Sequence, residues 1–290
     1  MKKIGLGILM GIVILSLSGI VGAGKLIPVA NQAQEKAKAD NSPVIEKVDD
    51  YLISAAPERV VFIHYKKGYG GFCDNDGICE KDLGENPSCA DCKKDKEEPE
   101  EPATACYAFL GKWVKWREFP VNYVIDPDNP DGLTEKFVIG AMSAGAEEWN
   151  SHTSEDLFGS YTVEHDSSWD SDAPDGRNEM LFGDYPRDGV IAVAIIWGYF
   201  TGPPSSRKIL EFDILFDTDF TWGDAVINPE VMDLQNIATH EIGHGAGLAD
   251  LYETACLDET MYGYSDYGEV KKRDLNAGDI TGIQELYGGF

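Results

Sequence analysis

The chain has 290 residues and a mass of 31.8 kDa, which is enough for one large domain or two small ones, each with a buried core. Its composition, 43% hydrophobic and 26% charged residues, is that of a globular protein and excludes wholesale disorder. The net charge of −27 is concentrated in residues 106–290. It would repel phosphate backbones and anionic membrane surfaces, so we expect no nucleic-acid partner.

Residues 1–23 have the pattern of an export signal. Lys2 and Lys3 precede an uncharged apolar stretch, and small residues at 21–23 offer a cleavage site. The stretch is also about long enough to span a bilayer. An uncleaved N-terminal anchor is therefore the alternative, and it is the only membrane attachment we expect. In both cases the rest of the chain lies outside the cytoplasm, so we predict an extracellular protein, either secreted or tethered to the cell surface.

Residues 24–72 form a modest segment that we interpret as a propeptide or an accessory piece. Residues 44–56 follow a serine–proline pair and have the pattern of a capped amphipathic helix. Residues 59–65 are rich in β-branched and aromatic side chains, which predicts a strand. The sequence does not say whether this segment inhibits, anchors or targets the rest of the chain.

Residues 73–92 form a cysteine-rich module. It holds four of the six cysteines: Cys73, Cys79, Cys89 and Cys92. A segment this short cannot bury a core, so cross-links must hold it. Outside the cytoplasm disulfides are expected. A zinc site is the alternative, because Cys89 and Cys92 have the spacing that zinc sites use.

Residues 93–105 have the charged, proline-containing composition of an acidic linker. The remaining cysteines are Cys106 and Cys256. They could pair with each other and brace the larger domain, or Cys106 could pair within the module. The larger folded domain is expected to span residues 106–290.

The strongest chemical signal lies in residues 231–251. His240 and His244 are four positions apart, so both imidazoles project from one face of a helix, where they could bind zinc. Glu241 is beside His240, where its carboxylate can reach a water on the metal. Gly247 allows the chain to turn after the helix, and Asp250 can then return toward the metal as a third ligand.

The extended motif of residues 240–250 resembles the metzincin metallopeptidases, in which aspartate replaces the last histidine in some branches. Met261 resembles the methionine of the turn beneath the metal in that family. Residues 275–288 are similar to the final helix of the matrixin branch. The resemblance covers residues 106–290, with weaker likeness to matrixin strands at 116–126, 189–199 and 211–223 and to the first matrixin helix at 133–150.

The resemblance implies an α/β (α+β) fold: a matrixin-like catalytic domain with a twisted mixed sheet and an active-site helix, preceded by the small cysteine-rich module. It implies one catalytic zinc held by His240, His244 and Asp250, with Glu241 as general base and Met261 in the turn below.

The family pattern is incomplete in three places. Outside the motif the chain has only His64, His152 and His165, so we do not predict the family's second zinc site. The cysteine-containing propeptide switch is absent. Tyr262 is followed by Gly263 where the family usually has proline.

The resemblance also implies that a substrate strand adds to an exposed sheet edge at residues 190–195, contacting Val190, Ala192 and Ala194. Tyr262 and Tyr264 would line the pocket on the leaving side, or else pack around the turn. Polypeptide substrates in extended or unfolded form fit this geometry. We expect a monomer, because the edge must stay free for substrate.

We therefore predict a secreted or surface-tethered zinc endopeptidase. A non-catalytic binding or adhesion protein that keeps the fold and the metal is the alternative, and a metal hydrolase acting on other substrates is a third interpretation. Calcium is a second candidate ion, because residues 125–132 and 166–176 form oxygen-rich loops, although solvated turns have the same composition. The sequence names no substrate and no cleavage preference.

Overall fold

The computed structural model describes residues 45–46, 56–68, 105–169 and 171–289, all within the compact unit Ala39–Phe290. The predictions for residues 1–23 and for the cysteine-rich module lie outside the described residues. No helix in the described part is long and apolar enough to cross a membrane.

The strands, in chain order, are β1 (Ile45–Glu46), β2 (Glu58–Lys66), β3 (Val121–Ile125), β4 (Phe158–Val163), β5 (Glu179–Gly183), β6 (Val190–Tyr199), β7 (Lys208–Asp217), β8 (Trp222–Gly223), β9 (Met232–Asp233) and β10 (Tyr264–Ser265). The helices are α1 (Glu135–Asn150), α2 (Leu234–Gly245) and α3 (Ala277–Tyr287), with short 3₁₀ turns η3 (Thr254–Cys256) and η4 (Lys271–Arg273).

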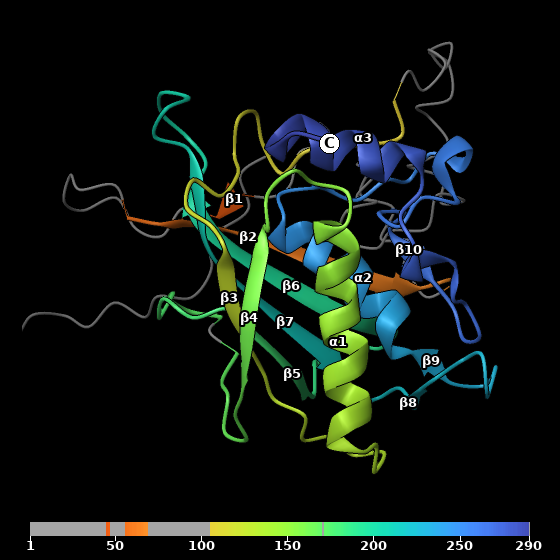
Figure 1. The fold of residues 1–290 in the computed structure, drawn as a ribbon. Coiled ribbons are helices and arrows are strands. Elements are labelled where there is room, and N and C mark those ends of the chain that lie inside the picture. Colours follow the sequence, from red (N-terminus) through yellow and green to blue (C-terminus); the bar gives the residue numbers. More distant parts are fainter. Residues whose placement is uncertain (1–44, 47–55, 69–104, 170, 290) are drawn as a thin grey trace, which may run out of the picture. The chain divides into compact units, whose positions relative to one another are not determined.

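One mixed sheet organises the described chain, in the order β1-β2-β6-β7-β5-β3-β4, with β10 also paired to β2. β6 runs antiparallel to both of its neighbours, β2 and β7, whereas β7, β5, β3 and β4 run parallel to one another. Helices α1 and α2 lie together against one face of this sheet (Figure 1). The main core fills the space between these helices and the sheet, and β6 is buried along almost its whole length.

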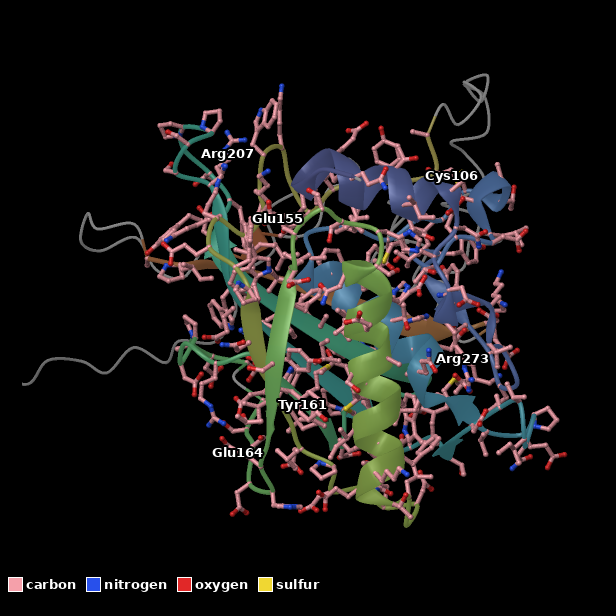
Figure 2. All side chains as sticks on the ribbon, viewed as in Figure 1. Cys106, Glu155, Tyr161, Glu164, Arg207 and Arg273 are labelled. Atoms are coloured by element: carbon pink, nitrogen blue, oxygen red, sulfur yellow. A yellow bond between two sulfur atoms is a disulfide. The ribbon has the colours of Figure 1, made fainter. Side chains whose placement is uncertain are left out.

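Two capping arrangements fix the starts of α1 and of the site helix α2. Thr134 caps α1 by accepting a hydrogen bond from the backbone of Phe137. Asp233 caps α2 in the same way, and its carboxylate also pairs with the Arg273 guanidinium, which reaches Asp224 as well. Arg273 lies beside the start of α2 (Figure 2). The C-terminal part of the chain thus anchors the first turn of the site helix.

The fold confirms the matrixin-like α/β prediction, and a strand or helix overlaps each of the expected ranges 116–126, 133–150, 189–199, 211–223 and 275–288. Two details differ. Ile45–Glu46, expected in a helix, pairs with β2 as a strand. The strand expected as an exposed edge, β6, is an inner strand because β2 pairs along it. Val60 to Ile63 of β2 are all apolar, so the strand has apolar side chains on both faces to bury, as suits an inner strand.

The sulfur atoms of Cys106 and Cys256 lie 2.10 Å apart, at disulfide distance. The pair joins the first described residues of the larger domain, where Figure 2 labels Cys106, to the loop that follows α2. This is one of the two pairings that the sequence left open for Cys106.

Candidate metal and catalytic site

Helix α2 and the turn after it bring the motif residues together. His240, Glu241 and His244 all lie on α2, and each is fully buried. Gly247 has φ +103°, a conformation that favours glycine, and it turns the chain out of the helix as expected. The turn returns Asp250 to the two imidazoles: its Oδ1 lies 3.2 Å from His240 Nε2 and 3.5 Å from His244 Nε2.

These three atoms are suited to bind one metal ion. Each is buried, and none has a hydrogen-bond partner among the described residues. The opposite ring nitrogens are engaged: His240 Nδ1 donates to the carbonyl of Thr260 at 2.6 Å and His244 Nδ1 to that of Leu248 at 3.0 Å. These bonds place each ring proton on Nδ1, so both Nε2 lone pairs face Asp250.

The donor set fits zinc. All three ligand atoms lie within 4.8 Å of one another, as a shared ion requires. Two neutral imidazoles and one carboxylate are zinc ligands. Burial alone would raise the pKa of Asp250, but His244 and His240 beside it hold that pKa well below its usual range. The carboxylate is therefore ionised, the form that binds a metal.

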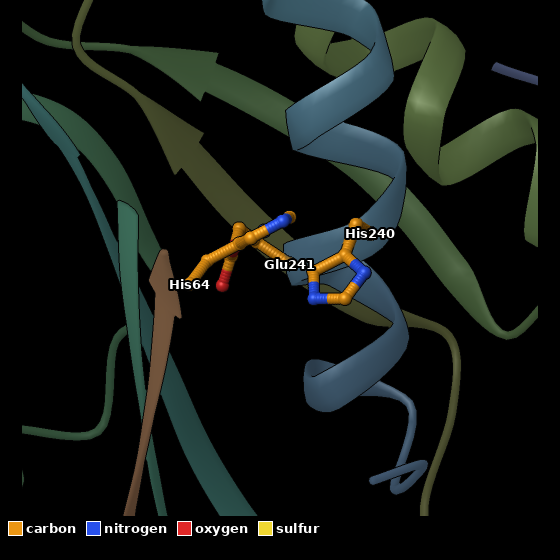
Figure 3. Close-up of side chains that lie close together, drawn as sticks. All are labelled: His64, His240 and Glu241. Carbon is orange, nitrogen blue, oxygen red and sulfur yellow. The ribbon is translucent and has the colours of Figure 1, made fainter. Parts of the chain in front are cut away.

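Glu241 is positioned beside this set and is held by a residue that the sequence analysis did not single out as part of the site. His64 Nδ1 lies 2.8 Å from Glu241 Oε1, while Glu241 Oε2 is buried without a hydrogen-bond partner in the described part of the chain. Burial raises the pKa of Glu241 to about 8. Figure 3 shows His64 reaching from β2 toward Glu241 and His240 on α2.

The hydrogen-bond partners of His64 fix its proton. Ser265 Oγ lies 3.1 Å from His64 Nε2, and Lys272 Nζ lies 3.4 Å from it. Burial, followed by the charges of His240 and Lys272, holds the pKa of His64 well below its usual value, so the ring is neutral. With donors facing Nε2, the single ring proton belongs on Nδ1 and is donated to Glu241.

Lys272 is an unexpected component of the site. Its side chain is fully buried, and its ammonium donates to the carbonyl of Tyr262. Burial lowers the pKa of Lys272 to about 7. No pattern in the sequence marks this lysine, since it stands between two other basic residues. For His64 a signal was present: Val60, Phe62 and His64 alternate along β2, which places the imidazole on the face of two buried apolar residues.

The turn that carries Met261 lies below α2, where the sequence analysis expected it. Met261 is buried, and a side chain at Gly243 of α2 would meet its sulfur atom. Asp279 of α3 accepts hydrogen bonds from the backbone nitrogens of Thr260 at 2.6 Å and Met261 at 3.1 Å. Since the Thr260 carbonyl also accepts the hydrogen bond from His240 Nδ1, α3 orients a candidate metal ligand through this turn.

The hydroxyl of Tyr252 holds the Asp250 carboxylate in place. Tyr252 Oη donates to Asp250 Oδ2 at 3.2 Å, which leaves Oδ1 directed at the histidines. The Tyr252 ring occupies the place of a side chain at residue 263, because a Cβ there would approach ring carbons of Tyr252 at 2.5 and 2.8 Å. Gly263 is therefore required by close packing. In the sequence, Gly263 stands out as a departure from the family pattern, whereas nothing there marks the role of Tyr252.

The predicted substrate-contact residues are near the site but covered. Val190, Ala192 and Ala194 are fully buried in β6, and their partners on β2 are Tyr65, His64 and Phe62. Tyr264 begins β10, which pairs with the other edge of β2. The Tyr262 and Tyr264 rings lie 6.0 Å apart, centroid to centroid. Substrate contact by these five residues stays a prediction.

Two further groups of acidic side chains could hold a cation. Asp126, Asp128 and His165 form one, and its two aspartates come from the predicted loop 125–132. Asp184, Asp217 and Asp219 form the other, which the sequence analysis did not identify. Calcium binding stays a prediction.

Comparisons with known proteins agree with this geometry. Residues 185–288 match the matrixin family model. Metalloendoproteinase 2-MMP of Arabidopsis thaliana is 28% identical over 189 residues, 61% of this chain and 43% of that protein. Stromelysin-1 of Mus musculus is 28% identical over 176 residues, 60% of this chain and 33% of that protein. Metalloendoproteinase 4-MMP of Arabidopsis thaliana is 33% identical over 103 residues, 36% of this chain and 27% of that protein.

Fold, site and matches together support a matrixin-like metzincin. The chain spans less than half the length of the relatives named above. The family match includes α2, Asp250, the Met261 turn and α3, whereas β2 lies outside it.

Proposed function

We propose that the protein is a zinc-dependent endopeptidase that acts on extended or unfolded polypeptides. The observation that carries the proposal is the convergence of three buried ligand atoms, without hydrogen-bond partners in the described chain, beside the Glu241 carboxylate. Names of the matched proteins support the same activity, since they include metalloendoproteinases.

In this proposal His240, His244 and Asp250 hold one zinc ion. When bound, the ion would supply Lewis-acid polarisation of a water molecule and of the scissile carbonyl. Glu241 takes a proton from the attacking water and later donates it to the leaving amine. Thr260 and Leu248 keep the imidazoles in the ligand tautomer, and the Met261 turn supports the helix from below.

The proposal also includes the location of the protein, the way substrate binds and the oligomeric state. An export signal or anchor at residues 1–23 and the Cys106–Cys256 pair support action outside the cytoplasm, where disulfides persist. Substrate would bind in extended form, with Tyr262 and Tyr264 on the leaving side. A monomer suffices for this reaction, because all the proposed groups come from one chain.

Peptide hydrolysis by the purified chain tests the function. We expect Glu241→Gln to lower kcat by about a thousandfold or more while one zinc per chain is retained, because the substitution removes the base and none of the ligands. Glu230→Gln, at an exposed carboxylate ten residues before His240, is the matched control and should keep wild-type activity. Zinc binding by all three chains with no cleavage of unfolded casein by any of them would favour the binding-protein alternative.

A further inference from the structure

Two loops, residues 111–117 and 201–208, carry positive charge and no acidic residue in a chain whose net charge is −27. Five of the eleven basic residues of the larger domain lie in them: Lys112, Lys115, Arg117, Arg207 and Lys208. Figure 2 labels Arg207 in the second loop. We call the two loops together the basic platform.

Two arginines join these loops through backbone carbonyls. Arg117 donates to the carbonyl of Pro204 at 2.9 Å and to that of Arg207 at 3.1 Å. Arg207 donates in return to the carbonyl of Lys112 at 2.8 Å. Carbonyl oxygens satisfy the guanidinium donors but carry no net charge. The bonds therefore hold the two loops together and leave their positive charge in place.

No carboxylate neutralises the basic platform within the described part of the chain, since none of its five cations forms an ion pair there. Glu118 follows the first loop directly, but it is exposed and makes no ion pair with the described residues either. Burial, with the like charge of Arg117 beside it, lowers the pKa of Lys115. The platform thus keeps a mutual repulsion that an anionic partner would relieve.

Trp113 is held in an unusual conformation in the middle of the first loop. Its φ is +69°, in the left-handed region that bulky residues rarely adopt, and the residue is 59% exposed. A hydrogen bond from Arg117 to the Trp113 carbonyl, at 3.2 Å, supports this conformation. Residues held in such conformations are concentrated at functional sites. The platform therefore offers an exposed aromatic ring among its cations.

A groove of about 250 Å³ opens beside the basic platform, between the starts of β3 and β7, and Arg117 and Lys208 both line it. Strand β5, which lies between β3 and β7, has not yet begun at this level. Asn178 spans the gap, donating to the Asn122 carbonyl at 2.8 Å and accepting from the Phe212 nitrogen at 2.9 Å. The groove gives an acidic side chain a place beside two cations.

The first loop is fastened to the end of the site helix α2. The backbone nitrogen of Leu110 donates to the Gly247 carbonyl at 2.9 Å, and the Trp116 indole donates to the Gly245 carbonyl at 2.7 Å. Gly245 directly follows His244, a candidate metal ligand. A chain bound to the platform is therefore held in a fixed position relative to the candidate site.

We propose that the basic platform binds an acidic stretch of a polypeptide, with carboxylates on its lysines and arginines and the Trp113 ring against the chain between them. The inference rests on the proposed function, which makes polypeptides the ligands of this protein. It names the preferred substrates as those that carry such a stretch. A long polyanion, such as a nucleic acid or an anionic glycan, would extend past the platform over surface of its own sign of charge and be repelled, whereas a short acidic stretch would not.

Fluorescence anisotropy of a labelled glutamate-rich peptide tests the inference, with Glu241→Gln in every full-length chain so that the peptide is not cut. Lys112→Glu should weaken binding by about fivefold or more at about 50 mM salt, and about 500 mM salt should remove the difference. Trp113→Gly should weaken binding as well, without loss of stability, because glycine adopts φ +69° readily. Lys136→Glu, at an exposed lysine of α1, makes the same change of charge outside the platform and should weaken binding by less than about twofold.

The outcomes separate this inference from the proposed function. Equal affinities of Lys112→Glu and Lys136→Glu would overturn the platform, and so would binding of a labelled oligogalacturonate in preference to the peptide. Cleavage of casein by the wild-type chain without binding of the acidic peptide would also overturn it, while the peptidase function would stand. Peptide binding that depends on Lys112, with no cleavage by the wild-type chain, would support the platform and count against the peptidase function.

Discussion

At the scale of single residues, the orientation of the Asp250 carboxylate depends on its neighbour Tyr252. A carboxylate has two oxygens that can turn toward a metal, whereas the structure directs only Oδ1 at the histidines. The hydroxyl of Tyr252 holds the other oxygen, and Gly263 leaves room for the Tyr252 ring. We infer that Tyr252 positions the carboxylate and acts on the metal only through it.

Tyr252→Phe should therefore weaken zinc binding by about tenfold, as loss of a ligand-orienting hydrogen bond commonly does. Competition with a chelator measures the affinity directly. Tyr161→Phe, at a largely exposed tyrosine of β4, is the control and should leave the affinity unchanged. Equal zinc affinities in Tyr252→Phe and wild type would show that Asp250 needs no such support.

At the scale of elements, the start of α3 is coupled to the site turn through two carboxylates. Asp279 holds the backbone of Thr260 and Met261, and Glu259 accepts from the backbone nitrogens of Gly278 and Asp279 at 3.0 and 3.2 Å. Burial, together with the charge of Asp279, raises the pKa of Glu259 to about 7 from its usual 4.5. Burial also raises the pKa of Asp279.

This pair predicts a pH dependence of stability. Between pH 4.5 and about 7 the folded chain binds more protons at Glu259 than the unfolded chain does, so the free energy of unfolding falls as pH rises through that window. Glu259→Gln removes this contribution and should reduce the accompanying fall in Tm by about 2 °C or more. Glu285→Gln, at an exposed position on α3, is the control. Parallel Tm curves for Glu259→Gln and wild type across the window would contradict the coupling.

The site helix and the covering strand differ in how far the sequence could predict them. The ligand spacing on α2, the turn at Gly247 and the return of Asp250 are local features, so residues 240–250 sufficed to predict their arrangement. Strand β2 was also identified locally, but its partner was not. Pairing of β2 with β6 joins residues more than a hundred positions apart, and nothing in residues 59–65 specifies which edge they cover.

At the scale of the whole molecule, the Cys106–Cys256 pair closes a loop with a sequence separation of 150 residues. A cross-link over so long a loop restricts the unfolded chain strongly. Replacing both cysteines by serine should lower the free energy of unfolding by about 3–5 kcal/mol. Denaturant unfolding of both chains measures this difference. If the wild-type Cys106–Cys256 pair is shown to be oxidised and the denaturation midpoint is still unchanged by the replacement, the cross-link does not stabilise the fold.

The long-range contacts also explain which parts of the site the sequence analysis missed. His64 and Lys272 reach the same imidazole, His240, from strand β2 and turn η4. They are separated by 208 positions, so no local spacing relates them. By contrast, the order of strands and helices from 116 to 288 followed from the family resemblance, because the matched elements occur in the same order along the chain.

The identity of the metal ligands is the central claim, and X-ray absorption at the zinc edge of the full-length protein tests it most directly. We expect one zinc per chain with only nitrogen and oxygen neighbours at about 2.0–2.1 Å, two of them imidazoles. The same spectrum is expected for His64→Ala, and Asp250→Ala should lose most of its zinc. Sulfur neighbours at about 2.3 Å, which would place the ion in the cysteine-rich module, or loss of an imidazole in His64→Ala would contradict the account.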